Sequence, residues 1–193
     1  LRIFFFDRPT DPIELIRNLT RYSEIARREG ILSLERVTNE LQDDFLAKAL
    51  RLAIDGTSID MINEIMSTEL EYMERRHQEG KKIFDAMATY CPAFGMLGTI
   101  MHLTVALSNL KNPQTIGPAI AAALLTTFYG VLGCYAIFTP VAKKLEARSK
   151  SEALKCEMII RGVMAIQAGD TPRIVGEKLR VFLAKAEAAQ VAR

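Results

Sequence analysis

Residues 86–142 decide the fold of this chain and read AMATYCPAFGMLGTIMHLTVALSNLKNPQTIGPAIAAALLTTFYGVLGCYAIFTPVA. This stretch contains no Asp, Glu or Arg and a single Lys, Lys111. Lys111 separates residues 86–110 from residues 112–142. An α-helix crosses the ~30 Å hydrocarbon core of a membrane with ~20 residues, and each of these two segments is longer than that. We therefore predict an integral membrane protein of the all-α class, with a transmembrane helical hairpin at residues 86–142.

Basic residues are distributed unequally around the two predicted spans. Nine Lys or Arg residues lie just before the first span or just after the second, whereas Lys111 alone lies in the connection. The nine are Arg75, Arg76, Lys81, Lys82, Lys143, Lys144, Arg148, Lys150 and Lys155. Because basic residues favour the cytoplasmic side, we expect both ends of this chain in the cytoplasm and the turn at residues 108–115 outside. The whole chain has 25 basic and 23 acidic residues, so its formal net charge of +2 gives no indication of nucleic acid as a partner.

The rest of the sequence divides into three further segments. Residues 1–8 begin with LRIFFF, which fits either the end of a preceding transmembrane helix or a flexible apolar terminus. Since Leu1 is not a methionine and no signal cleavage site follows, we expect that the chain starts within a longer protein. We predict a cytoplasmic helical domain at residues 9–85 and cytoplasmic helices at residues 143–193. No apolar run alternates with period two, so we expect no sheet.

Capping residues and glycines give the expected boundaries of the first helices. Asp11 and Pro12 are typical of a helix start, and Gly30 is typical of the position just after a last turn. Ser33 is expected to start a short second helix. A third helix is expected to end at Gly56.

The later boundaries follow from the same residue types. Ser58 can cap a long helix that has no proline before Pro92, so we expect one helix to continue from the cytoplasm into the membrane. Residues 169–172, Gly-Asp-Thr-Pro, end one helix and start the next, with the threonine as the cap and the proline in the first turn.

Small and polar residues recur on one face of each predicted span. The first face has Gly95, Thr99, His102 and Ala106, and the second has Ala119, Ala123, Thr126, Thr127, Gly130 and Cys134. Such faces pack against protein and not against lipid. Thr99 is almost as far along the chain from Ala86 as Thr127 is from Ala142, so the folded hairpin brings both threonines to a similar depth. The two hydroxyls either line a hydrated ion path, or each bonds the carbonyl of its own helix four residues earlier.

Ionisable groups are scarce at membrane depth. No carboxylate occurs between Asp85 and Glu146, so an acid that carries ions must come from another polypeptide. His102 is the only ionisable side chain within the spans, and it is either a relay group or a neutral helix-packing residue. Pro92 and Pro140 fall near the cytoplasmic ends of the two spans and suggest hinges.

Catalysis has no support in this sequence. It contains no Gly-rich phosphate loop, no cluster with metal-ligand spacing and no arrangement typical of an activated nucleophile. The cysteines are odd in number, which disfavours a disulfide framework, and we interpret each as a small buried hydrophobe: Cys91, Cys134 and Cys156. We therefore predict that the protein is not an enzyme, has no metal site and needs no cofactor besides a transported ion.

Three separated motifs resemble those of a known family. They are PAFGMLGT at residues 92–99, IGPAIAAALLTTFYG at residues 116–130 and ARREGILSLER at residues 26–36. The sequence GDTPR at residues 169–173 fits the same family. The chain resembles the flagellar motor stator subunits of the MotA and PomA family, within the MotA/TolQ/ExbB superfamily. The resemblance implies a subunit with four transmembrane helices in the bacterial inner membrane, of which this chain holds the last two and the end of the second.

The resemblance also implies partners and a function. Five copies would surround two copies of a MotB- or PomB-like subunit, which supplies the ion-carrying Asp and the peptidoglycan anchor. Ion flow, of H⁺ or Na⁺, would drive torque on a FliG-like rotor protein and so support motility. Membrane lipid would surround the assembly.

Particular residues match the motifs of the family. Thr99 and Thr127 match the hydroxyls opposite the partner's Asp, and Pro92 and Pro140 match the paired prolines near the ion site. The cytoplasmic charges that engage the rotor correspond to Arg27, Arg28 and Glu35. Arg36 and Thr38 stand where relatives carry further acids, so the rotor charge pattern is only partly kept.

Two alternatives remain beside the motor interpretation. An ExbB- or TolQ-like proton channel that energises outer-membrane processes shares the small-residue hairpin, although the cytoplasmic motif at residues 26–36 argues against it. A non-conducting membrane scaffold would use the hairpin only as an anchor. Substitution of Thr127 should impair a channel and leave a scaffold unchanged.

Overall fold

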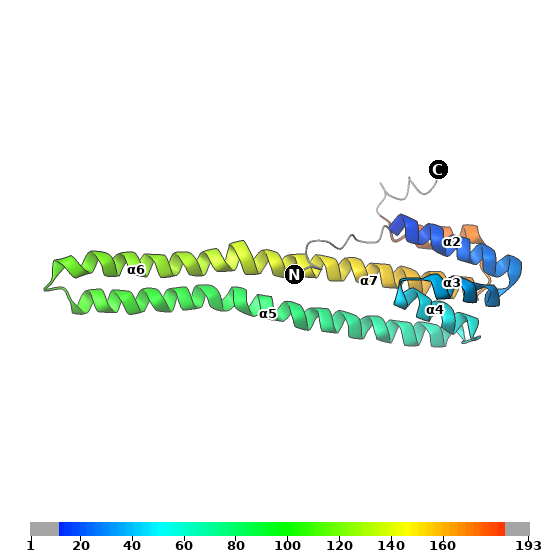
Figure 1. The fold of residues 1–193 in the computed structure, drawn as a ribbon, viewed down its shortest axis with the longest axis horizontal. Helices are drawn as coiled ribbons and strands as arrows, with labels where there is room; N and C mark the ends of the chain where they lie inside the picture. The colour runs from blue at the N-terminus through cyan, green and yellow to red at the C-terminus, as the bar shows by residue number, and fades with distance from the viewer. Residues whose placement is uncertain (1–11, 184–193) are drawn as a thin grey trace. The chain divides into compact units, whose positions relative to one another are not determined.

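The computed structural model describes residues 12–183, which form two compact units. One unit combines the chain up to Glu74 with the chain from Lys150 onward, and the other consists of residues 75–149. All regular elements among the described residues are helical (Figure 1). The expected all-α class is therefore confirmed. Asp11 and residues 1–8 lie outside the described residues, so the predictions made for them stay predictions.

The first unit contains the short helices of the chain. They are α2 (Pro12–Glu29), the 3₁₀ turn η1 (Ile31–Leu34), α3 (Glu35–Glu40), α4 (Asp44–Ile54) and α8 (Pro172–Arg180). The beginning of α5 (Ile59–Ser108) and the end of α7 (Thr139–Gln167) complete the unit. Thr171 caps α8 by accepting from the Ile174 N–H at 3.4 Å, as the Gly-Asp-Thr-Pro pattern predicted.

Glycines end the helices where the sequence indicated. Gly30, Gly56 and Gly169 adopt φ of 87°, 76° and 77°, a left-handed backbone that side chains with a Cβ rarely tolerate. The expectation for Ser33 was wrong, because the 3₁₀ turn begins at Ile31 and the next α-helix begins at Glu35. Ser33 lies inside that turn, where its hydroxyl donates to the Gly30 carbonyl at 2.6 Å instead of capping a helix.

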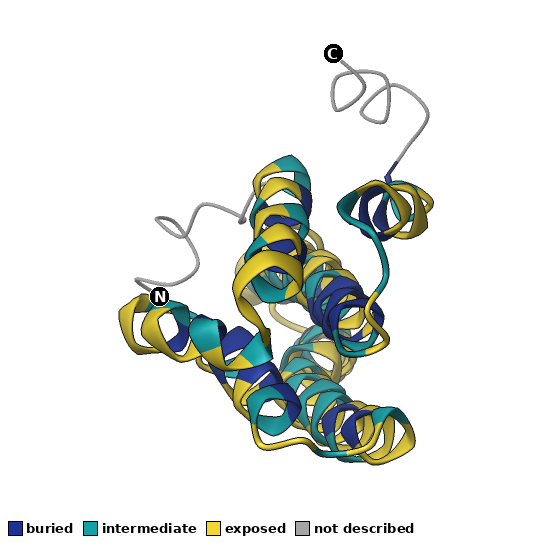
Figure 2. Ribbon diagram, turned by 90° about the vertical axis from the view of Figure 1, so that its right-hand side faces the viewer, coloured by how far each residue is buried: buried dark blue, intermediate teal, exposed yellow. Residues whose placement is uncertain are grey.

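The core of the first unit is formed by aliphatic side chains of all its longer helices. Leu19, Leu50, Met158 and Val163 are fully buried, and Figure 2 shows the buried residues on the faces that the helices turn toward one another. Helices α2 and α7 approach closely at Gly162, where a Cβ would lie 2.7 Å from a methyl carbon of Leu19. Burial of apolar area therefore holds the unit together.

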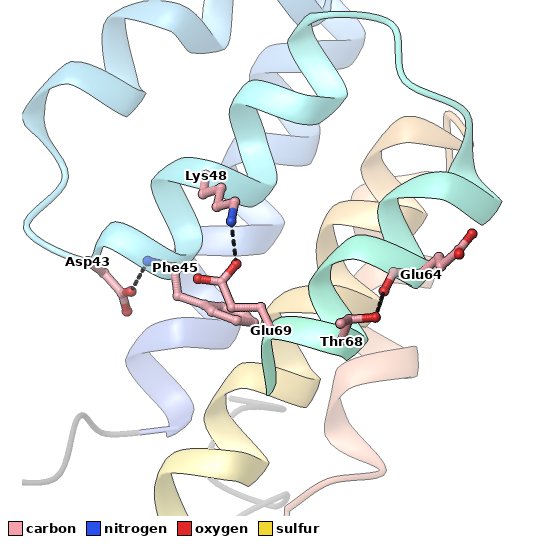
Figure 3. A network of polar contacts seen from close by, with 6 residues as sticks. All are labelled: Asp43, Phe45, Lys48, Glu64, Thr68 and Glu69. Carbon is pink, nitrogen blue, oxygen red and sulfur yellow. Dashed lines mark hydrogen bonds and ion pairs between the residues drawn. The ribbon is translucent and has the colours of Figure 1, made fainter. Parts of the chain in front are cut away.

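Polar contacts fix α4 at the surface of this core. Asp43 caps α4 by accepting from the N–H groups of Phe45 and Leu46 at 3.1 and 3.2 Å, and it pairs with Lys155 at 2.6 Å. Lys48 of α4 pairs with Glu69 of α5 at 2.7 Å (Figure 3). These contacts connect α4 to both long helices of the chain.

The second unit, residues 75–149, contains the predicted hairpin. Helix α5 passes through Pro92 without a break and ends at Ser108, and α6 (Pro113–Leu132) begins after Asn112. A π-helical segment, η2 (Gly133–Phe138), follows and leads directly into α7. The expected long helix from Ser58 onward is confirmed, because the Ser58 hydroxyl accepts from the Met61 N–H at 3.4 Å and α5 runs for 50 residues.

The cysteines follow the sequence interpretation in two of three cases. Cys134 and Cys156 are buried, whereas Cys91 is only half-buried, and all three are free thiols. The Cys91 sulfur lies beside the start of η2, where it would be 2.7 Å from a Cβ on Gly133. The interpretation of Cys91 as a buried residue therefore holds only in part, because only one side of this residue packs against the facing helix.

Candidate functional site

Glycines bring α5 and α6 into backbone contact along their shared face. A Cβ on Gly95 would lie 2.8 Å from the Thr126 carbonyl oxygen, and a Cβ on Gly130 would lie 2.8 Å from the Cys91 carbonyl oxygen. The same Gly130 Cβ would lie 3.1 Å from the Cα of Gly95. We call this line of contacts the glycine seam. It confirms that the small faces predicted from the sequence pack against protein, here against each other.

Threonine hydroxyls gather one turn beyond the glycine seam. The Thr99 Oγ1 lies 3.0 Å from the carbonyl oxygens of both Gly95 and Ala123, 3.3 Å from the Thr126 Oγ1 and in hydrogen-bond contact with the Thr127 Oγ1. The two threonines singled out from the sequence therefore meet, as their positions in the spans predicted. The alternative for Thr99 also holds, because its hydroxyl reaches the carbonyl four residues earlier in its own helix.

The number of hydroxyl protons limits which hydrogen bonds this threonine cluster can form. A threonine hydroxyl donates one hydrogen bond and can accept two. Thr126 donates to the Ala123 carbonyl at 2.8 Å, and Thr99 can donate to only one of the two carbonyls within its reach. The proton of the Thr99–Thr127 contact then belongs to Thr127, whose side chain is exposed. Thr127 thus presents unused oxygen lone pairs on the outer side of the hairpin, where they could accept from water or coordinate a cation.

Thr126 was not selected as a site residue from the sequence. Its hydroxyl bonds Ala123, and its Cβ would lie 2.9 Å from a Cβ placed on Gly98. The adjacent Thr-Thr pair at residues 126 and 127 was the available signal, because consecutive helical residues point about 100° apart and only one of them can lie in the seam. Thr126 fills the seam and Thr127 lies at its edge.

His102 is held by its own helix. Its Nδ1 lies 3.0 Å from the Gly98 carbonyl oxygen, and the side chain is half-buried. A carbonyl oxygen only accepts, so Nδ1 carries a proton and donates. This contact fits the helix-packing interpretation of His102.

The prolines lie at different levels of the hairpin. Pro92 faces Gly130, since a Cβ on that glycine would lie 3.3 Å from the Cα of Pro92. Pro140 follows ten residues later, beyond the π-helical segment η2. Because Pro140 cannot donate and its ring crowds the preceding turn, the helix widens before it, and the Thr139 N–H bonds the Cys134 carbonyl five residues back. The hinge role of both prolines stays a prediction.

The predicted rotor-contact charges lie where α2 ends and α3 begins. Arg27 and Arg28 occupy the last turn of α2 and Glu35 opens α3, and all three are exposed. Basic residues at a helix C-terminus and an acidic residue at an N-terminus are also favourable for the helices themselves. Arg28 pairs with Glu24 at 2.6 Å. Their role at the rotor stays a prediction.

Large apolar side chains cover the outside of the hairpin. Phe94 and Tyr135 are each 69% exposed, and many neighbours on both helices are exposed as well. Within the described residues, two stretches are long and apolar enough to cross a membrane, Ile59–Ser108 and Pro113–Gln167, with mean hydropathy of 1.4 and 1.8 in their most apolar windows. Lipid or other protein must cover such a surface.

A small-residue hairpin with an apolar exterior and a hydroxyl cluster at its seam fits a membrane-embedded channel subunit. The chain belongs to the MotA/TolQ/ExbB proton channel family, whose profile matches residues 37–158. It is 40% identical to "Motility protein A" of Borreliella burgdorferi over 97% of this chain and 73% of that protein. It is 36% identical to "Chemotaxis protein PomA" of Vibrio alginolyticus over 93% of this chain and 70% of that protein.

A solved structure agrees with these relationships. The structure of the flagellar MotAB stator complex from Bacillus subtilis matches with a TM-score of 0.91 and 36% identity, over 100% of this chain and 76% of that chain. The chain therefore spans about seven tenths to three quarters of the length of these relatives. The resemblance that the motifs indicated is confirmed.

Proposed function

We propose that this chain belongs to an ion-conducting stator subunit of the bacterial flagellar motor, which couples H⁺ or Na⁺ flow to torque on the rotor. The observation that carries the proposal is the hydroxyl pair of Thr99 and Thr127 at the edge of the glycine seam. The motility proteins and the stator complex to which the chain is similar support the motor in particular.

A second subunit supplies the acid that carries the ion in this proposal. Residues 86–142 contain no Asp or Glu, so the hairpin offers hydroxyl and carbonyl oxygens and no carboxylate of its own. A MotB- or PomB-like partner, anchored to peptidoglycan, would place its Asp against Thr127. The exposed lone pairs of Thr127 would then stabilise the ion or water next to that carboxylate.

To generate torque, the complex that conducts the ions must also contact the rotor. Each charge that crosses ~100 mV releases ~2.3 kcal/mol, so a few ions can drive a mechanical step. We assign the contact with a FliG-like rotor protein to Arg27, Arg28 and Glu35, which are exposed where α2 ends and α3 begins. Exposed ion pairs contribute about 0–1 kcal/mol each, which suits contacts that form and break in every step.

The assembly we propose is a homopentamer in the bacterial inner membrane, surrounded by lipid, with both ends of this chain in the cytoplasm. The orientation is supported by the nine basic residues that flank the hairpin against the single Lys111 in its turn. The proline pair Pro92 and Pro140 would let the helices bend near the ion site. We propose no catalytic activity.

The test replaces the exposed hydroxyl in the native subunit, expressed with its partner in a strain that lacks its own stator. Thr127→Val removes the hydroxyl with little change of shape, and Thr127→Ser restores it. Thr104→Val is the matched control, because Thr104 is also exposed in a span and its hydroxyl, among residues 12–183, bonds only the Ile100 carbonyl of its own helix at 2.8 Å.

We expect Thr127→Val to reduce swimming speed strongly, whereas Thr127→Ser and Thr104→Val should swim like the parent. Swimming speed measured against sodium concentration, and then with a protonophore, identifies the ion. If Thr127→Val swims as fast as Thr104→Val, the hydroxyl pair has no part in conduction.

An ExbB- or TolQ-like channel is the second candidate, because the matching family includes those proteins. Co-purification separates the two. A peptidoglycan-binding partner supports the motor, whereas a TonB-like partner supports the energising of outer-membrane processes. A non-conducting scaffold would be insensitive to Thr127→Val.

A further inference from the structure

A groove with arginines on both walls lies between α2 and α8. Its volume is about 610 Å³, and its charged lining comes from Arg17, Arg21 and Glu24 of α2 and from Arg173, Glu177 and Arg180 of α8. The two helices are separated by almost the whole chain and are in contact with each other. The groove is therefore a product of the fold and not of a local sequence cluster.

The acids of this groove are already engaged. Glu24 pairs with Arg28 at 2.6 Å, and Glu177 pairs with Arg180 at 2.9 Å. Within residues 12–183, Arg17, Arg21 and Arg173 form no ion pair. Arg17 and Arg21 also lie one helical turn apart, where like charges repel each other. Within the described part of the chain, the groove thus presents three arginines without an ion-pair partner, beside two acids that pair with other arginines.

A matching set of acids lies on another helix of the same unit. Asp60, Glu64, Glu71 and Glu74 recur along α5 at positions i, i+4, i+11 and i+14, which places them on one side of the helix. None of the four forms an ion pair within the described part of the chain. The first three are exposed. We call these four residues the acidic stripe, and it is about 21 Å long at 1.5 Å per residue.

We propose that the arginine groove of one subunit receives the acidic stripe of a second copy of this chain. This inference rests on the proposed ring of subunits, in which each copy has one neighbour on either side and two different patches meet at every interface. Asp60 and Glu64 have the same i, i+4 spacing as Arg17 and Arg21, about 6 Å, so two ion pairs can form side by side.

A second copy fits this groove better than a small anion. The stripe is rigid, since it is part of a continuous helix, and each ring contains as many stripes as grooves. Guanidinium groups bind carboxylates through two parallel hydrogen bonds, which favours a carboxylate-bearing helix that enters in one register. Free inorganic phosphate would satisfy the arginines and leave the acidic stripe without partners.

Cysteine cross-linking tests the pairing in membranes that contain the native subunit and its partner. One copy carries Arg21→Cys and one tag, and a second copy carries Glu64→Cys and a different tag. Oxidation should produce a species with both tags. The control replaces Glu64→Cys by Glu157→Cys, an exposed acid of α7 outside the stripe. Absence of the doubly tagged species, or equal yields with the control, overturns the proposal.

Charge exchange tests the chemistry of the same contact. Arg17→Glu with Arg21→Glu should lower the yield of intact oligomer in detergent roughly tenfold, because like charges then face each other. Adding Asp60→Arg and Glu64→Arg should restore the yield. The control, Arg51→Glu with Arg161→Glu, makes the same change of charge at exposed positions away from the groove and should leave the yield unchanged. Failure of the exchange to restore assembly overturns the pairing.

These measurements do not depend on swimming. A failed Thr127 experiment together with a positive cross-link would reject the motor and keep the interface. Normal dependence on Thr127 without the cross-link would keep the motor and reject the interface.

Discussion

Gly130→Ala is the substitution that tests the glycine seam most directly. The added Cβ would lie 2.8 Å from the Cys91 carbonyl oxygen and 3.3 Å from the Cα of Pro92, and both contacts are with backbone of the facing helix. Ordinary van der Waals contact of a Cβ begins near 3.4 Å, so the two helices must separate by about 0.6 Å at this point. No side-chain rotation can relieve the clash, because the atoms that it involves belong to the two backbones.

The expected loss of stability in Gly130→Ala equals the usual cost of overpacking, about 1–3 kcal/mol. Gly80→Ala is the control in α5, because nothing lies within 4 Å of a Cβ at Gly80. At such an open position inside a helix, alanine is favoured over glycine by about 1 kcal/mol. The same chemical change is therefore expected to have opposite signs at two positions of the second unit.

The assay is thermal unfolding of the purified native complex in detergent, read together with swimming speed. Gly130→Ala should lower the midpoint and slow swimming, because displacement of α6 also separates Thr127 from Thr99. Gly80→Ala should melt at or above the parent. If Gly130→Ala melts at or above Gly80→Ala, the close backbone contact between α5 and α6 does not exist.

Three further predictions concern the first unit. Ser23→Ala removes a buried hydroxyl that donates to the Asp170 carbonyl at 3.1 Å, and it should cost about 1 kcal/mol of unfolding free energy in urea titrations, whereas a neutral result would mean that the bond contributes nothing. Asp43→Asn should keep the cap of α4 and lose the ion pair to Lys155, while Asp43→Ala loses both, so hydrogen exchange of the first α4 amides should rise by about fivefold more in Asp43→Ala if the cap is worth ~1 kcal/mol. Burial raises the pKa of the Cys156 thiol from 9.0 to about 12, so iodoacetamide at pH 8 should label this residue only after denaturation. Since the unfolded thiol ionises first, the stability that this group contributes is fully present below pH 9 and falls as the pH rises toward 12, which a Cys156→Ala variant should not show.

The sequence predicted the hairpin because its signal was physical and continuous. The absence of any acid from residues 86–142 leaves few environments other than lipid, and small residues at helical spacing leave few surfaces on which two spans can pack. The meeting of Thr99 and Thr127 followed from their matched positions relative to the two ends of that stretch. Glycines 30, 56 and 169 could be placed at helix ends because only glycine adopts their backbone conformation cheaply.

Other features of the structure could not be predicted, because they depend on contacts between residues that are far apart in the sequence or on backbone geometry. Serine is a typical helix-capping residue, but the 3₁₀ turn that follows Gly30 begins two residues before Ser33. Within that turn the Ser33 hydroxyl donates to the Gly30 carbonyl. The π-helical segment before Pro140 has two causes. The proline has no N–H to donate, and the start of the segment packs against Cys91, whose sulfur would lie 2.7 Å from a Cβ on Gly133. The arginine groove joins α2 to α8, and nothing near Arg17 in the sequence indicates that Arg173 is its neighbour in space.

The chemistry at Thr127 depends on the glycines more than on the threonines. A side-chain oxygen of one helix can lie 3.0 Å from a carbonyl of another, as Thr99 does from Ala123, only where the two backbones almost touch. Gly95 and Gly130 allow that approach, and Gly95 also provides one of the carbonyls that Thr99 can use. In the proposed ion path the oxygen atoms would therefore be oriented before any ion or partner arrives, so that binding at this edge would not have to reorder them. A larger residue in the seam should impair ion passage even when every hydroxyl is still present, which separates this interpretation from one in which the threonines act alone.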